Sequence, residues 1–178
     1  KKGYVVKFLG DNFLHEEPYS TTLQQMGIEV LYGDDYAAGI WDWLKTNGDE
    51  INYAYLNRPH IAAKYVDYIK DYTKMKVIYY GHDLHFLRLG REYELTGDIH
   101  IKREADYWKS VELTMMHKAA VSYYPSYVEI NAIHAIDGSI HAKAITAYVY
   151  DTFLSNIQDD FAKREGLLFV GGFAHPPN

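Results

Sequence analysis

Short apolar runs alternate along the chain with longer segments in which apolar residues recur every three or four positions. The short runs are rich in β-branched and aromatic residues and predict strands, whereas the longer spacing predicts helices with one buried face. The predicted strands cover residues 4–9, 28–32, 51–56, 76–80, 120–124 and 141–148. The predicted helices cover residues 19–26, 36–46, 59–72, 85–95, 102–118 and 127–136.

Strands that alternate with helices in this way are typical of a parallel sheet with helices on both faces. We therefore predict an α/β fold, a Rossmann-like three-layer domain with a mostly parallel central sheet, over residues 1–150. The ends of the elements support this division. Pro59 occupies a first-turn position of its helix, and Ser126 with Glu129 forms a capping box at the start of another.

Composition removes several classes of function. The chain has 178 residues, no cysteine and a net charge of −6. Without cysteine there can be no disulfide, zinc–thiolate site or thiol nucleophile. An acidic chain is not expected to bind a phosphate backbone, so we expect no nucleic-acid partner. The sequence shows neither a signal peptide nor an apolar run of about 20 residues, which predicts a cytoplasmic location, with peripheral association at the inner face of the membrane as a variant.

The 18 tyrosines are an unusual feature of this composition. We interpret most of them as core residues whose rings pack in strands and whose hydroxyls reach hydrogen-bond partners. Stacking against carbohydrate is the alternative. The tyrosines at expected core positions are Tyr53, Tyr55, Tyr79, Tyr80, Tyr123, Tyr124, Tyr148 and Tyr150.

Candidate chemistry gathers where predicted strands end, because ligands of open parallel sheets bind outside the carboxyl ends of the strands. His82, Asp83, His85 and Arg88 directly follow the strand at 76–80. These side chains can donate, accept and neutralise charge around a ligand, and the N-terminus of the next helix adds a positive field. The alternative is that Asp83 only caps this helix while the histidines are exposed loop residues.

Other charged and polar residues carry weaker signals. A metal site at His82 and His85 is disfavoured by their spacing, and we expect no metal. Asn12 and Arg58 end two other strands and are candidate ligand contacts, with a solvated loop or a cap as the alternative. The sequence has no dinucleotide, P-loop, esterase or zincin motif, and we expect no cofactor. A solvated helix face is the main interpretation of Arg91, Glu92, Glu94, Arg103, Glu104, Asp106, Lys109 and Glu112.

The block Asp83-Leu84-His85-Phe86-Leu87-Arg88, within the run 77–98, resembles a segment of bacterial group 1 glycosyltransferases of the two-Rossmann GT-B architecture. In that family a strand, this block and a charged helix follow one another. Flanking pieces also resemble the family: residues 3–8 with 23–30, residues 119–129, and residues 166–178, which are similar to the opening strand and glycine loop of its second domain.

The resemblance implies that the chain is one half of a GT-B fold, the acceptor-side domain. It implies transfer of a sugar from a nucleotide-sugar donor to a hydroxyl of a carbohydrate or lipid-linked acceptor, in surface polysaccharide synthesis. His82 takes the place of a histidine that faces the transferred sugar, so we assign it a catalytic role with Asp83 as its support. The expected substrate contacts are His85, Arg88, Arg91, Arg58 and Asn12. A non-catalytic α/β ligand-binding or interaction domain is the alternative from another class.

The family pattern also contains parts that this sequence lacks. A further strand normally precedes residues 4–9, and in a 3-2-1-4-5 strand order it would lie between 4–9 and 51–56. Its absence predicts two unpaired strand edges, which we expect residues 167–170 to fill, within the chain or by strand exchange in a homodimer. Residues 151–178 are expected to be a linker and the first strand of the missing donor-binding domain, and the fragment alone is expected to be inactive.

Overall fold

The computed structural model describes residues 3–146, 152, 162 and 165–168. The chain divides into two units, residues 1–147 and 148–178, and every helix and strand described here lies in the first. The predicted role of residues 151–178 as a linker and a first strand stays a prediction, because most of that segment lies outside the described residues.

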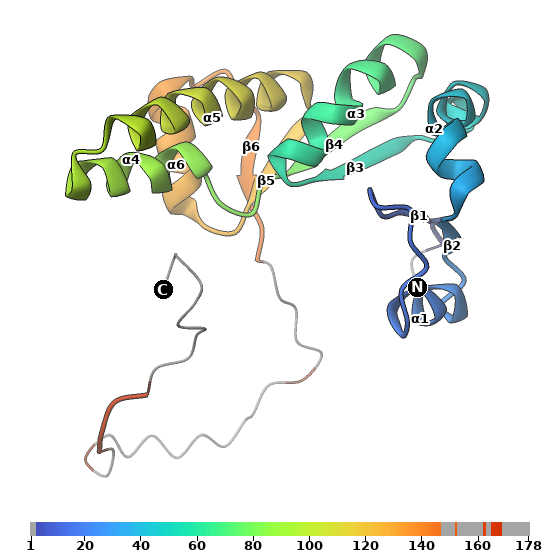
Figure 1. Cartoon of the computed structure of the whole chain (residues 1–178), viewed down its shortest axis with the longest axis horizontal. Coiled ribbons are helices and arrows are strands. Elements are labelled where there is room, and N and C mark those ends of the chain that lie inside the picture. Colours follow the sequence, from blue (N-terminus) through green and yellow to red (C-terminus); the bar gives the residue numbers. More distant parts are fainter. Residues whose placement is uncertain (1–2, 147–151, 153–161, 163–164, 169–178) are drawn as a thin grey trace. The chain divides into compact units, whose positions relative to one another are not determined.

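The strands form two parallel sheets (Figure 1). In the smaller sheet, β1 (Lys7–Leu9) pairs with β2 (Glu29–Leu31). The larger sheet contains β3 (Tyr53–Asn57), β4 (Lys76–Tyr80), β5 (Val121–Tyr124) and β6 (Ala142–Ala144), in this order and all parallel. The predicted parallel α/β architecture is therefore confirmed.

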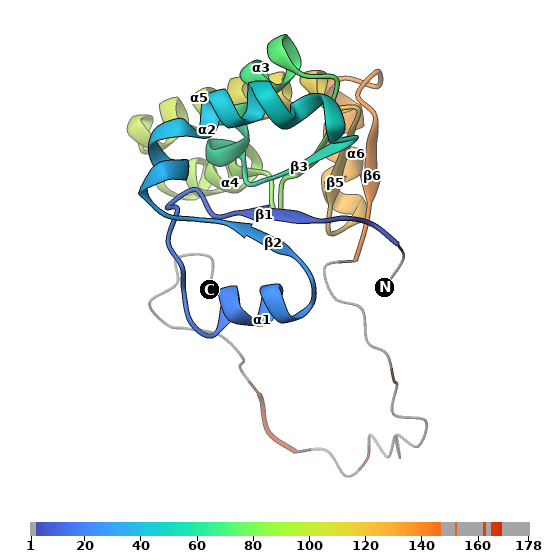
Figure 2. The ribbon, with the colours of Figure 1, turned by 90° about the vertical axis from the view of Figure 1, so that its right-hand side faces the viewer.

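Helices connect successive strands. They are α1 (Tyr19–Gln25), α2 (Asp34–Asn47), α3 (Pro59–Tyr72), α4 (His85–Thr96), α5 (Ile99–Lys118) and α6 (Tyr127–Ile136), and a short 3-10 turn at Gly48–Glu50 follows α2. Figure 2 shows β1 and β2 between α1 on one side and α2, α3 and α5 on the other. Together with the parallel strands, this arrangement is a Rossmann-like three-layer domain, as predicted.

Local signals explain where several helices begin. The Ser126 hydroxyl accepts a hydrogen bond from the Val128 backbone N–H at 3.1 Å and also bonds to the Glu129 side chain, as the predicted capping box requires. Pro59 opens α3, where its missing N–H costs no hydrogen bond. The predicted last strand is shorter than expected: β6 ends at Ala144, and residues 147 and 148 of the prediction lie outside the described residues.

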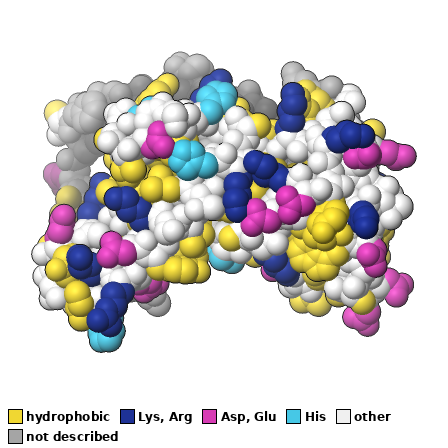
Figure 3. Space-filling model, turned by 90° about the horizontal axis from the view of Figure 1, so that it is seen from above, with side chains coloured by type: hydrophobic (Ala, Val, Ile, Leu, Met, Phe, Trp, Pro, Cys, Tyr) yellow, Lys and Arg dark blue, Asp and Glu magenta, His cyan; other side chains and the backbone are white. Residues whose placement is uncertain are grey.

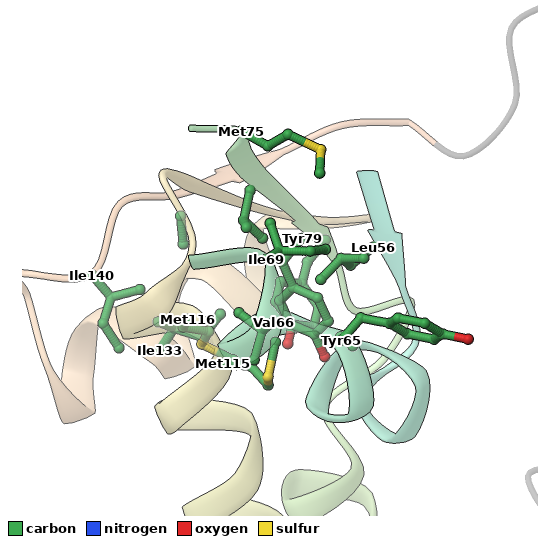
Figure 4. Packing of buried hydrophobic residues seen from close by; sticks show 14 of the residues in the cluster. Leu56, Tyr65, Val66, Ile69, Met75, Tyr79, Met115, Met116, Ile133 and Ile140 are labelled. Carbon is green, nitrogen blue, oxygen red and sulfur yellow. The ribbon is translucent and has the colours of Figure 1, made fainter. Parts of the chain in front are cut away.

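The core lies between the larger sheet and the helices that cover it (Figure 4). Apolar residues of α3 recur on one helical face and are almost completely buried. They pack with Met115 and Met116 of α5 and with Ile133 of α6. The buried side chains on this face of α3 are Ala62, Tyr65, Val66 and Ile69.

β1 and β3 belong to different sheets and do not pair with each other among the described residues. This separation agrees with the expected gap of one strand between residues 4–9 and 51–56. The expected occupant is not seen in the described part of the chain. Leu167 and Leu168 are exposed and lie in no strand, and the remaining two residues of 167–170 lie outside the described residues. Pairing of residues 167–170 with these strand edges, within the chain or by strand exchange in a homodimer, therefore stays a prediction.

Basic and acidic side chains are mixed on the face of the protein shown in Figure 3. Ion pairs at the protein surface include Lys118 with Asp67 at 2.6 Å and Lys74 with Asp49 at 3.0 Å. No helix in the described part of the chain is long and apolar enough to cross a bilayer.

Candidate functional site

The carboxyl ends of β3 and β4 lie side by side and supply the first residues of the site. Asn57 is in register with Tyr80, so the loops that follow the two strands begin at the same edge of the sheet. The Arg58 backbone N–H donates to the Tyr80 carbonyl at 3.1 Å and holds these loops together. Arg58 and His82 both have φ of +66°, a left-handed conformation that costs about 1–3 kcal/mol outside glycine and often marks functional loops.

His82 lies between these two loops. Its Nε2 is 2.5 Å from Oδ1 of Asn57, and its ring meets the edge of Tyr80 at a centroid distance of 4.6 Å. Burial, followed by the nearby Arg58 guanidinium, lowers the pKa of His82 below its ordinary value. At neutral pH the His82 imidazole is therefore an uncharged hydrogen-bonding group.

His85 has a different partner, the carboxylate of Glu112 on α5. Glu112 is 0% exposed and accepts three hydrogen bonds: its Oε1 from the His85 backbone N–H at 3.0 Å and from Nδ1 of His85 at 3.1 Å, and its Oε2 from the Phe86 N–H at 3.2 Å. A carboxylate taken out of water needs such donors to offset its desolvation. The hydrogen bond to Glu112 raises the pKa of His85, although burial opposes this effect.

The carboxylate of Glu112, a residue of α5, also lies at the N-terminus of α4. The first helical N–H groups normally lack partners and attract anions, but here two of them already bind an internal carboxylate. The expected positive field at this terminus is therefore compensated inside the protein. Asp83 does not cap the helix either, because the N-cap is Leu84 and the cap hydrogen bonds go to Glu112.

Asp83 and Arg88 complete the cluster at its surface. Nε of Arg88 donates to Oδ2 of Asp83 at 3.3 Å, and Oδ1 of Asp83 is 3.9 Å from Nδ1 of His85. Asp83 is expected to support His82, yet its closest charged partners in the structure are Arg88 and His85. An exposed pair of this kind contributes little stability, so its main effect is to orient Arg88.

The structure brings together Arg58, His82, Asp83, His85 and Arg88. Arg91 does not join them: it is exposed on α4 and makes no ion pair or hydrogen bond with a described residue.

Asn12 lies in a separate loop after β1, where its side chain donates to Glu16 at 3.0 Å and accepts from the Leu14 N–H at 3.2 Å. These local bonds shape a turn. The same loop is tied to α3 through Asp11, which accepts from Lys64 and from the Tyr65 hydroxyl at 2.7 Å each.

Glu112 is the residue that the sequence interpretation missed. It was assigned to a solvated helix face, and this is wrong because its side chain is completely buried. A signal was present: Glu112 lies four positions after Trp108 and three before Met115, so it shares the helical face of two apolar residues. A carboxylate on such a face needs buried donors, and the N-terminus of α4 supplies them.

Buried tyrosines underlie the loop that carries His82. Tyr79 and Tyr124 are fully buried, meet edge to face at 6.2 Å and interact through their hydroxyls, whereas the buried Tyr80 hydroxyl has no hydrogen-bond partner among the described residues. Burial raises the pKa of Tyr79 and of Tyr124. The expectation that each buried hydroxyl finds a partner is wrong for Tyr80, and Tyr53 and Tyr55 are exposed rather than core residues.

Comparison with protein-family models, with curated proteins and with solved structures found no match. Within the described residues, no group of three or more His, Asp or Glu side chains is arranged to hold a metal ion. The interpretation of the site therefore depends on its own chemistry and on the resemblance of residues 77–98.

Proposed function

We propose that this chain contains the acceptor-side domain of a GT-B glycosyltransferase that moves a sugar from a nucleotide-sugar donor to a hydroxyl acceptor. The observation that carries the proposal is the cluster of Arg58, His82, Asp83, His85 and Arg88 at the carboxyl ends of adjacent parallel strands. Ligands of open α/β sheets bind at this edge. Most of the cluster also belongs to the sequence block that resembles the family.

The roles follow from the environment of each side chain. His82 is neutral and held by Asn57, which suits a group that faces sugar hydroxyls and the reacting carbon. Arg88, oriented by Asp83, is suited to contact the acceptor. The donor would be held mainly by the second domain of the family, whose opening segment resembles residues 166–178. A cytoplasmic location, and surface polysaccharide as the product, belong to the same proposal.

Trp108 offers a direct test because its ring lies 5.0 Å from that of His85. Titration of the chain with a panel of oligosaccharide acceptors should change tryptophan fluorescence in a saturable way, and the change should disappear in Trp108→Phe. Nucleotide sugars should bind weakly, because their phosphate and ribose contacts belong to the other domain. A dissociation constant near 1 μM, about −8 kcal/mol, for a nucleotide sugar would show that the two halves are assigned wrongly.

The alternative, a non-catalytic ligand-binding or interaction domain, makes a different prediction in the same titration. It predicts that a ligand, if one binds, is not transferred, so a sugar that binds without any transfer to an acceptor supports the alternative. Sequencing of the parent gene separates the two in another way, because the glycosyltransferase proposal requires a further domain of roughly 150–200 residues after Asn178.

A further inference from the structure

The helices of the larger sheet pack against one of its two faces. Its strands follow one another in the order β3-β4-β5-β6, and right-handed crossovers between successive neighbours place the connecting helices on the same side. The core agrees with this topology, because α3, α5 and α6 pack against strand residues of a single face (Figure 4). The strand residues in this core are Leu56, Val77, Tyr79, Tyr124 and Ala142.

The opposite face of the same sheet carries apolar side chains that remain exposed. Burial alternates along β3, where Leu56 is 9% exposed but Tyr55 is 59% and Tyr53 is 55% exposed. The register places Tyr55 beside Ile78 and Ile78 beside Val121, so an apolar row crosses three strands. The side chains of this surface, which we call the open face, are Tyr53, Tyr55, Asn57, Lys76, Ile78, Tyr80, Val121, Tyr123 and Lys143.

The open face has the dimensions of one helix. Parallel sheets occur almost only with both faces covered, and a contiguous exposed apolar patch usually marks an interaction surface. Adjacent strands are about 4.8 Å apart, so the apolar row from β3 to β5 is about 10 Å wide, close to the diameter of a helix. β3 and β4 have five residues each and span about 16 Å, the length of roughly 11 helical residues. A helix of about three turns therefore fits this surface.

The charges of the open face indicate which kind of helix is complementary. Lys76 and Lys143 are exposed on it, and neither forms an ion pair with a described residue. None of the open-face residues is acidic. A second copy of this face would bring lysines together without a carboxylate, whereas a helix with carboxylates beside its apolar stripe would neutralise them. The complementary partner is thus a helix with an apolar stripe and acidic borders.

We propose that the open face binds an amphipathic α-helix of a second polypeptide. The apolar stripe of that helix lies over Tyr55, Ile78 and Val121, and its carboxylates pair with Lys76 and Lys143. This interaction goes beyond the proposed function, because it uses the face of the strands and requires no sugar transfer.

The test measures binding of fluorescein-labelled three-turn peptides to the full chain by fluorescence anisotropy. One peptide has leucines at helical spacing bordered by glutamates, and the other has the same leucines bordered by lysines. The glutamate peptide should bind about tenfold more tightly, and the double variant Lys76→Glu with Lys143→Glu should reverse this preference.

A second pair of variants locates the binding surface. Tyr55→Glu places a carboxylate within the apolar row and should weaken binding of the glutamate peptide about tenfold. Tyr107→Glu is the matched control, because Tyr107 is 61% exposed on α5, outside the open face, and its replacement should leave binding unchanged. If Tyr55→Glu does not fold, the reversal in the double lysine variant decides.

The proposal fails if the two peptides bind equally well, if neither binds at about 1 mM, or if Tyr55→Glu keeps wild-type affinity. Analytical ultracentrifugation that finds a dimer of the chain, converted to a monomer by Tyr55→Glu, would show instead that a second copy covers the open face. Protection of Tyr55 from nitration by tetranitromethane in the free monomer would also overturn the proposal, because the face would then already be covered.

Discussion

Gly81 separates β4 from His82, and replacing it with alanine should strain both the core and the site. A Cβ at this position would lie within 3.0 Å of the Cε1, Cζ and Oη atoms of Tyr124, whose side chain is fully buried. The ring cannot retreat without displacing its core neighbours, so we expect an overpacking cost of about 1–3 kcal/mol. In a domain of this size that corresponds to a fall in melting temperature of roughly 3–10 °C.

Gly90→Ala is the matched control, because it makes the same chemical change where a Cβ would meet no atom within 4 Å. Gly90 lies inside α4, and alanine should stabilise that helix by about 0.5–1 kcal/mol. Urea unfolding of both variants should therefore give changes of opposite sign. Combining Gly81→Ala with Tyr124→Leu should recover part of the loss through a favourable coupling energy. Equal stability of the two glycine variants would refute the close packing of Tyr124 under this loop.

Four further changes probe the residues beneath and around the site. Tyr80→Phe removes a buried hydroxyl that has no partner among the described residues, so chemical denaturation should show no loss or a gain of up to about 1 kcal/mol; a clear loss would reveal a hydrogen bond. Glu112→Ala should cost about 2–4 kcal/mol in the same assay because two N–H groups of α4 lose their acceptor, while Glu104→Ala on the exposed face of α5 should stay within about 0.5 kcal/mol. The folded-state pKa of His85 is raised above 6.5, so its stabilising contribution is full below that pH and is lost as pH rises through the folded value; His85→Gln should converge with wild type at high pH. The pKa of His82 is lowered, so stability is lost as pH falls through its folded value, and His82→Asn should flatten the acid side of the profile.

Elements with strong local signals could be predicted closely from the sequence. The bounds of α3, β4 and α6 agree with the predicted residues, because Pro59 and the Ser126 capping box mark two of the starts and a continuous apolar run marks the strand. Predicted strand 4–9 was too long: only Lys7–Leu9 pairs with β2, and no strand among the described residues lies at its other edge to extend the ladder.

The candidate site was predictable only in part. The strand-end position of His82 follows from the order of elements, but its contact with Asn57 depends on the register of β3 against β4, which no local pattern determines. The burial of Glu112 depends on the packing of α5 against the start of α4, a contact between residues far apart in sequence. Hydrogen bonds formed in this way raise the pKa of His85, and they appear only once the chain is folded.

Sugar transfer is the reaction that tests the central proposal most directly. The protein encoded by the parent gene is incubated with nucleotide sugars and hydroxyl acceptors, and the product is identified by mass spectrometry. We predict release of nucleoside diphosphate that depends on the acceptor, and a loss of about 100-fold in turnover in His82→Ala with little change in acceptor binding. The absence of product from every donor and acceptor would contradict the proposed function, and near wild-type turnover in His82→Ala would contradict the assignment of the site.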